Sequence, residues 1–205
     1  MSAHLMLMLT WILFGFIHSL TAATSFKQRL VRVGKWVPRY YRLLYNGLSL
    51  LTFLPVWLVF RAAPNQKIGV WQGSNNLGMF LIGLGLFVGA IALAGYDLVE
   101  FTGFPARQPD AKPDALRQQG LLRYVRHPLY LAMLVILTGL FVREPSWRSL
   151  LFSGFGFLYL RIGIFFEEQK LVRVFGQSYR NYQRKVPMLL PFITNKNRRS
   201  MDPLN

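Results

Sequence analysis

The sequence predicts an all-α protein of the polytopic membrane class, a helix bundle with about five transmembrane helices, its N-terminus outside and its C-terminus inside. Of its 205 residues, 53% are hydrophobic and only 16% are charged, and the mean hydropathy is +0.29. The hydrophobic fraction is higher, and the charged fraction lower, than in an ordinary soluble domain. The apolar residues also gather in runs that approach the roughly 20 residues a membrane helix needs. We interpret residues 1–205 as a single membrane domain.

The apolar runs give the helices in order along the chain. The fourth run is short, and Pro145 with a brief polar turn separates it from the fifth. These two are therefore predicted to form a tight helical hairpin in which the short arm leans on its neighbours. The expected spans are residues 5–26, 43–60, 77–95, 129–142 and 149–166.

The basic residues orient these spans, because short cytoplasmic loops retain Lys and Arg. Nineteen of the 24 Lys and Arg fall in the first connection, the third connection and the C-terminal tail. The third connection includes a proline- and charge-rich stretch, residues 104–119, that is expected to be a cytoplasmic loop. No basic residue precedes the first apolar run, so this run is expected to stay as an anchor and not to be a cleaved signal peptide. The opposite side holds Arg61, Lys67, Arg143 and Arg148, and Arg161 lies inside the fifth span.

Composition also bounds the ligands. The formal net charge of +16 would suit nucleic acid, but the basic residues lie between long apolar runs, which favours membrane lipids and topology and no nucleic-acid partner. There is no cysteine, so disulfides, thiolate metal sites and a cysteine nucleophile are excluded. His4, His18 and His127 lie far apart without metal-ligand spacing, and we expect no metal.

A first motif stands where the third loop meets the fourth span, at Arg126-His127-Pro128-Leu129-Tyr130. Local physics explains part of it. Proline suits the first turn of a helix, Arg126 can reach the headgroups, and Tyr130 can lie in the interfacial belt. On residue types alone, this structural interpretation stays open beside a functional one.

A second motif is the carboxylate pair Glu167-Glu168 at the inner end of the fifth span. Acids at a helix C-terminus oppose its dipole unless the helix continues, so the pair should have cations or hydroxyl donors nearby. A hairpin of spans four and five would bring His127 and Tyr130 to these glutamates. Arg161, deeper in the same span, is a functional candidate because ionisable groups inside spans are costly. The alternative is a structural ion pair with either glutamate or a side chain that reaches the headgroups.

In order and spacing, the region 120–192 resembles the C-terminal half of the isoprenylcysteine carboxyl methyltransferase family and its phospholipid-methyltransferase relatives. Two departures are Ala132, where the family often has glycine, and Leu122, where an aromatic residue is common. The residues that carry the likeness are Arg126-His127-Pro128-Leu129-Tyr130, Glu167-Glu168, Leu171, Phe175-Gly176, Tyr179, Tyr182, Val186-Pro187 and Pro191-Phe192.

The resemblance implies a membrane methyltransferase that uses S-adenosylmethionine, with a pocket open to the cytoplasm. It implies that Arg126, His127, Pro128 and Tyr130 form the part that holds the amino-acid end of the cofactor. Glu167 and Glu168 would then accept hydrogen bonds from the ribose hydroxyls or the ammonium group. Methyl transfer from a sulfonium needs in-line positioning and a water-poor site more than acid or base chemistry.

The N-terminal half resembles instead the families related to NnrU and to bacterial methanethiol S-methyltransferase. The likeness rests on His18-Ser19-Leu20, Lys27 and the run from Arg39 to Asn46. His18 is either a packing histidine or a group that faces the methyl acceptor, because a neutral imidazole inside a span needs a partner. With Asn46 it is expected to supply the few polar groups of an acceptor pocket. Arg42, Tyr45 and Asn46 would otherwise be interface anchors.

The sequence thus predicts a methyltransferase of the inner (plasma) membrane of a bacterium, with a small-molecule or lipidic acceptor. Its expected regions are 1–95 for the acceptor, 120–192 for the cofactor and 193–205 as a basic tail. His18, Asn46 and Arg161 are the catalytic candidates. The alternatives are a non-catalytic NnrU-like accessory protein and a lipid-binding scaffold driven by the tail.

Overall fold

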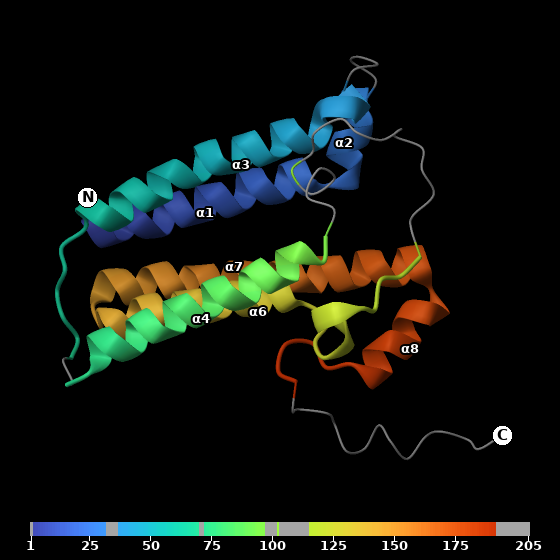
Figure 1. Ribbon diagram of the computed structural model, residues 1–205. Coiled ribbons are helices and arrows are strands. Elements are labelled where there is room, and N and C mark those ends of the chain that lie inside the picture. Colours follow the sequence, from blue (N-terminus) through green and yellow to red (C-terminus); the bar gives the residue numbers. More distant parts are fainter. Residues whose placement is uncertain (1, 32–36, 70–71, 97–101, 103–114, 192–205) are drawn as a thin grey trace.

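The computed structural model describes residues 2–31, 37–69, 72–96, 102 and 115–191. In this part of the chain every regular element is a helix, and the extended pairing is an isolated bridge between Lys67 and Ser146. The predicted all-α class is confirmed (Figure 1). The basic tail and most of the expected loop at 104–119 lie outside the described residues. The helices are α1 (Ala3–Ala22), α2 (Thr24–Val31), α3 (Val37–Ala62), α4 (Ser74–Ala94), the 3-10 helix η1 (Gly120–Arg123), α6 (Pro128–Arg143), α7 (Trp147–Phe175) and α8 (Gln177–Lys185).

Within the described residues, α1, α3, α4 and α7 are long and apolar enough to cross a membrane, and α6 is a shorter apolar helix. The protein is therefore an integral membrane protein with about five apolar helices. With 16 residues, α6 is about 24 Å long, less than the roughly 30 Å of a hydrocarbon core. The short fourth span predicted from the sequence is thus present as a helix.

The first span is shorter than predicted. We expected it to run to Phe26, but α1 ends at Ala22, Ala23 has extended backbone with φ −65° and ψ 134°, and a separate helix begins at Thr24. The 20 residues of α1 already measure about 30 Å. The following residues include Lys27 and Arg29, which favour the headgroup region over the hydrocarbon.

Helices α4 and α6 pack closely through glycines. A Cβ atom added at Gly78 would lie 2.5 Å from backbone atoms of Arg143, and one added at Gly85 would lie 2.6 Å from Ile136 Cγ1. From the other side, a Cβ at Gly139 would meet the Gly78 carbonyl oxygen at 2.8 Å. Because lipid offers no hydrophobic drive for helix association, such close backbone packing is what holds two membrane helices together. The short helix α6 is therefore held along α4.

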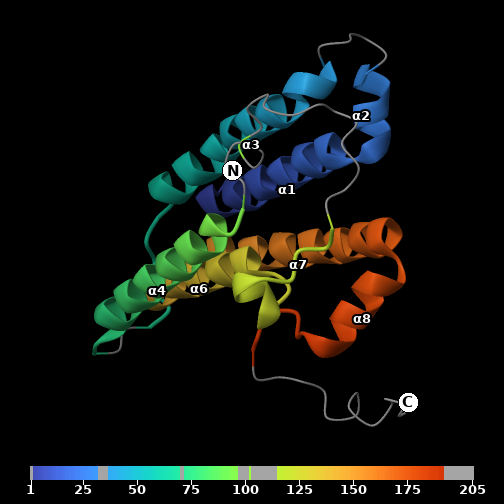
Figure 2. The ribbon, with the colours of Figure 1, turned by 45° about the vertical axis from the view of Figure 1, so that its right-hand side comes forward.

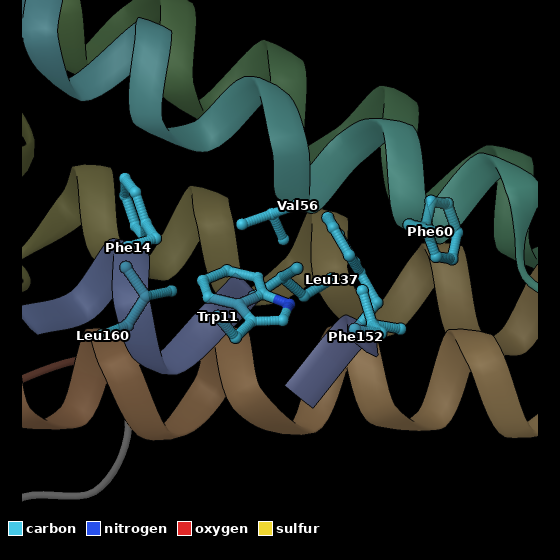
Figure 3. Packing of buried hydrophobic residues seen from close by; sticks show 8 residues of the cluster. Trp11, Phe14, Val56, Phe60, Leu137, Phe152 and Leu160 are labelled. Carbon is cyan, nitrogen blue, oxygen red and sulfur yellow. The ribbon is translucent and has the colours of Figure 1, made fainter. Parts of the chain in front are cut away.

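Helices α1 and α3 form a pair that lies against the group of α4, α6 and α7 in both ribbon views (Figures 1 and 2). The contact is an aromatic core in which Trp11 of α1 meets Phe14, Phe53 and Phe152 edge to face, with centroids 5.4–5.8 Å apart. Figure 3 shows Trp11 between α1, α3 and α7. Edge-to-face pairs add specificity to packing that hydrophobicity alone does not give. The buried members of this core are Leu7, Trp11, Phe14, Val56, Phe60, Leu137, Phe152 and Leu160.

Helix α7 extends past the predicted end of its span at Phe166 and continues to Phe175. Gly176, with φ of 55°, then reverses the chain into α8, a conformation that favours glycine. Two backbone hydrogen bonds fix the segment after α8 to the start of α6: Arg126 N–H donates to the Pro187 carbonyl at 3.0 Å and His127 N–H to the Met188 carbonyl at 3.1 Å. The chain after α7 thereby returns to the first motif.

Candidate functional site

The first motif folds as a helix start. Proline at the first position of α6 lacks only an N–H that would have no partner there, and His127 precedes it as the N-cap residue. The backbone bonds to Pro187 and Met188 satisfy the two residues before the helix. Arg126 and His127 are consequently buried, with 9% and 4% exposure. A buried arginine needs a counterion, and this one has it.

That counterion is Glu168. Arg126 donates from Nε to Oε1 at 2.9 Å and from a terminal nitrogen to Oε2 at 3.1 Å, the two-pronged geometry that arginine offers a carboxylate. The other terminal nitrogen of Arg126 donates to the carbonyls of Gln183 at 3.2 Å and Val186 at 2.6 Å. The guanidinium therefore ties α7 to the end of α8.

Three more donors reach the same carboxylate. His127 Nε2 lies 2.7 Å from Oε1, Tyr179 donates its hydroxyl to Oε1 at 2.8 Å, and Gln183 donates its amide to Oε2. Because a carboxylate only accepts, His127 carries a proton on Nε2. Burial and the bond to Glu168 raise the pKa of Tyr179 well above its usual range. Glu168 is 12% exposed at its side chain and its acceptor capacity is occupied by the protein itself.

Its neighbour Glu167 has a different environment. The side chain is 41% exposed, and its Oε2 lies 4.0 Å from His127 Nδ1, beyond a direct hydrogen bond. It interacts electrostatically with Tyr130 and with Tyr96, whose pKa is raised by burial and then by the charge of Glu167. Adjacent residues point about 100° apart on a helix, which explains why one glutamate is enclosed and the other is exposed.

Tyr130 reaches this position because α7 has glycine opposite it. A Cβ at Gly163 would come within 3.3 Å of the Tyr130 hydroxyl oxygen. Tyr159, Gly163 and Glu167 follow one another at four-residue spacing, so they lie along one face of α7. This face leads from the carboxylate into the bundle.

A second polar cluster lies at the deeper end of that face. The ring of Tyr159 meets the ring of His18 edge to face with centroids 5.6 Å apart. His18 Nδ1 lies 2.9 Å from Ser49 Oγ, and the hydroxyl of Tyr45 is hydrogen-bonded to His18 Nε2. His18 lies on α1, and Tyr45 and Ser49 lie on α3. Figure 1 shows that these two helices lie side by side.

The hydrogen bonds assign the tautomer of His18. Ser49 donates its only hydroxyl proton to the Tyr45 carbonyl at 2.7 Å, so toward His18 it can only accept. Nδ1 of His18 therefore carries the proton, and Nε2 presents its lone pair to the Tyr45 hydroxyl. The result is a basic nitrogen with a phenol in front of it.

The other two catalytic candidates are Asn46 and Arg161. Asn46 donates its amide to the Thr102 carbonyl at 3.0 Å, whereas both ring nitrogens of His18 are taken by Tyr45 and Ser49. Arg161 is exposed, and in the part of the chain that the structure describes it forms no ion pair with Glu167 or Glu168. The structural ion pair considered for Arg161 is therefore not found there. Among the same residues, no group of three or more His, Cys, Asp or Glu is arranged for a metal ion.

Sequence reasoning missed four polar partners. Tyr179 belongs to the resemblance but had no role, and Gln183 gave no signal. Tyr45 and Ser49 have the four-residue spacing that places two side chains on one helix face, and this spacing could have pointed to a shared partner.

Comparisons with known proteins cover both halves of the chain. A family model described as NnrU protein matches residues 6–191, which include the two polar clusters. Methanethiol S-methyltransferase of Crocosphaera subtropica is 29% identical over 198 residues, covering 90% of this chain and 73% of the relative. The enzyme of the same name from Pseudomonas deceptionensis is 32% identical, with coverage of 87% and 69%. Protein-S-isoprenylcysteine O-methyltransferase of Schizosaccharomyces pombe is 33% identical over 130 residues, which cover 63% of this chain and 53% of the relative. No solved structure matches the chain.

Proposed function

This chain belongs to the NnrU protein family, and we propose that it transfers a methyl group from S-adenosylmethionine to a small thiol. It is a membrane methyltransferase, since enzymes named for methyl transfer match it over most of its length. The thiol rests on one observation: relatives named methanethiol S-methyltransferase align with 87–90% of the chain, so the similarity includes the His18 cluster. A lipidic acceptor is the second candidate, supported by the isoprenylcysteine enzyme that matches 63% of the chain. The accessory-protein and scaffold alternatives are not favoured by these relatives.

We propose that the cofactor binds at the cluster around Glu167 and Glu168. Glu167 is the carboxylate that can accept hydrogen bonds from a ribose or an ammonium group, because its oxygens are not saturated by the protein. Tyr130 and Tyr96 lie beside it. Glu168 acts on this site indirectly, because it holds Arg126 and His127 in position. When bound, S-adenosylmethionine supplies a methyl group on a sulfonium sulfur.

The second polar cluster, formed by His18, Tyr45 and Ser49, can take the proton of the acceptor. Methylation of a thiol would form a new C–S bond as the bond between the methyl group and the donor sulfonium breaks, and it would release the S–H proton, so the site must take one proton per turnover. The Tyr45 oxygen can accept that proton while the Tyr45 hydroxyl proton passes to His18 Nε2. The resulting imidazolium still donates from Nδ1 to Ser49. Every hydrogen bond in the cluster is kept during this transfer, which lowers its cost.

The membrane and the orientation are also proposals. The excess of basic residues at the end that carries Glu167 supports a cytoplasmic position for this end and an inner (plasma) membrane of a bacterium. S-adenosylmethionine is a water-soluble metabolite, so a site at this end can bind it from the cytosol. The acceptor would enter from the bilayer.

The cofactor proposal predicts that Glu167→Gln weakens binding of S-adenosylhomocysteine without changing stability. Loss of one or two charge-assisted hydrogen bonds should raise Kd about tenfold to a hundredfold. Calorimetry on the purified protein measures this directly. Lys170→Gln, on the same helix and exposed, is the matched control and should bind as the wild type does. Equal affinity in both variants would place the cofactor elsewhere.

The acceptor proposal predicts that Tyr45→Phe lowers kcat for thiol methylation about a hundredfold, within the usual range of acid–base assistance. The affinity for S-adenosylhomocysteine should stay near wild type. The deficit should shrink as pH rises, because a growing share of the thiol then ionises without help from the protein, and a merely structural role would not give this recovery. Tyr40→Phe removes a hydroxyl from the same helix as a control. A pH-independent deficit would exclude the proton transfer.

A further inference from the structure

The end of the molecule opposite Glu168 contains two neighbouring cavities. The larger has a volume of about 340 Å³ and lies among the ends of α3, α6 and α7. The smaller, of about 180 Å³, lies beside the chain that leads into α4. Arg143 and Glu144 line both. Neither cavity touches the residues assigned to the cofactor or the acceptor.

Basic residues at this end of the molecule line the two cavities. Arg61, Lys67, Arg143 and Arg148 are the four that charge distribution assigns to this side, and all four line one cavity or both. Positive residues on this side act against the orientation of the protein, so their presence requires another reason. Ion pairing explains only part of it, because Glu144 is the single acidic residue lining the two cavities.

Glu144 is already engaged. It accepts a hydrogen bond from Arg148 at 2.8 Å, and Arg148 also donates to the Ala63 carbonyl at 3.3 Å and lies over the ring of Phe60. Arg148 Nε is nevertheless buried without a hydrogen-bond partner. Within the described residues, Arg61 and Arg143 form no hydrogen bond or ion pair through their side chains. The cavity therefore keeps two positive charges, those of Arg61 and Arg143, for a ligand.

The larger cavity also has an apolar and aromatic wall. Trp57 and Leu140 stand beside the arginines in the larger cavity, together with Phe60. Trp57 is 39% exposed on a helix that crosses the membrane, so this wall is continuous with the lipid-facing surface. A ligand that fits has an anionic head and an apolar tail. A free inorganic anion would use the arginines but not this wall.

We propose that this outer cavity binds the phosphate of an anionic phospholipid from the leaflet opposite the cofactor site. Arg61 and Arg143 neutralise the phosphodiester, and the acyl chain follows Trp57 and Leu140. Basic pockets between membrane helices recognise anionic headgroups in this way. The bound lipid joins α3 to α6, two helices that belong to different groups in Figure 2.

Native mass spectrometry of the detergent-purified protein tests this with phosphatidylglycerol and phosphatidylcholine in equal amounts. The wild type should retain phosphatidylglycerol in preference, and Arg61→Gln/Arg143→Gln should weaken this retention about tenfold or more. Arg173→Gln/Arg180→Gln removes two exposed arginines from the other end and should change it by less than about threefold. Binding of S-adenosylhomocysteine shows that each variant is folded, and Arg61→Gln alone serves if the double variant is not.

Three results would overturn the proposal. The first is equal retention of both lipids by the wild type, and the second is retention by the Arg61/Arg143 variant at the wild-type level. The third is displacement of the lipid by millimolar inorganic phosphate, which would show that the site takes a free anion.

Discussion

Replacing Glu168 by alanine should destabilise the folded protein by about 3–5 kcal/mol, the cost of leaving one member of a buried ion pair alone. The estimate applies because the side chains of Arg126 and Glu168 are only 6% and 12% exposed. The substitution also removes the hydrogen-bond acceptor of His127, Tyr179 and Gln183, which all bond to the same carboxylate. Unfolding curves in mixed micelles, with helicity as the signal, give the difference.

The comparison with Glu167 makes this test specific. Glu167→Ala removes an adjacent carboxylate of the same helix, but this side chain is 41% exposed, lies 4.0 Å from His127 Nδ1 and is hydrogen-bonded to the Tyr130 hydroxyl. Its stability should stay within about 1 kcal/mol of wild type. If the two variants unfold alike, the enclosed network around Glu168 does not stabilise the protein as proposed.

Gly78→Val should prevent α4 and α6 from packing and reduce the yield of folded protein strongly. The Cβ alone would lie 2.5 Å from the Cα and N atoms of Arg143, and backbone atoms cannot rotate away as a flexible side chain can. Overpacking in a well-filled interface costs about 1–3 kcal/mol and more where the backbone must move. Size-exclusion profiles and unfolding in micelles report the loss.

Gly83→Val is the matched control. Gly83 lies on the same helix and a Cβ there meets nothing within 4 Å, so the same change should be tolerated. Gly78→Ala should fall between the two. Equal behaviour of Gly78→Val and Gly83→Val would mean that α4 and α6 do not approach through their glycines.

The sequence predicted the fold class and the helices because long apolar runs with one-sided positive charge allow few other arrangements. It also predicted that the residues around His127 approach the glutamate pair, since a tight hairpin brings its two inner ends together. The end of α1 at Ala22 was not predictable in this way. Hydropathy falls only gradually there, and the backbone break at Ala23 leaves no mark on it.

The different burial and hydrogen bonding of Glu167 and Glu168 depend on the rotation of α7 about its axis and on the position of α8. A pair of adjacent carboxylates does not tell which one turns inward, and the donors Tyr179 and Gln183 come from a segment whose return path depends on Gly176. The partners of His18 depend on the register between α1 and α3. Asn46 was expected beside His18 because it lies at the same depth, but Tyr45 and Ser49 are on the helix face that reaches the imidazole.

The shortness of α6 has a mechanical consequence for the surrounding bilayer. A helix about 24 Å long, held firmly against α4, cannot tilt further to match a thicker hydrocarbon layer, so the lipids beside it must compress their acyl chains. Because α6 begins at Pro128, this dimple brings the aqueous boundary down to the level of His127 and Glu167. In the proposed reaction, a water-soluble cofactor would then meet an acceptor from the bilayer at a depth that an undeformed membrane would seal, and activity should depend on the length of the lipid acyl chains.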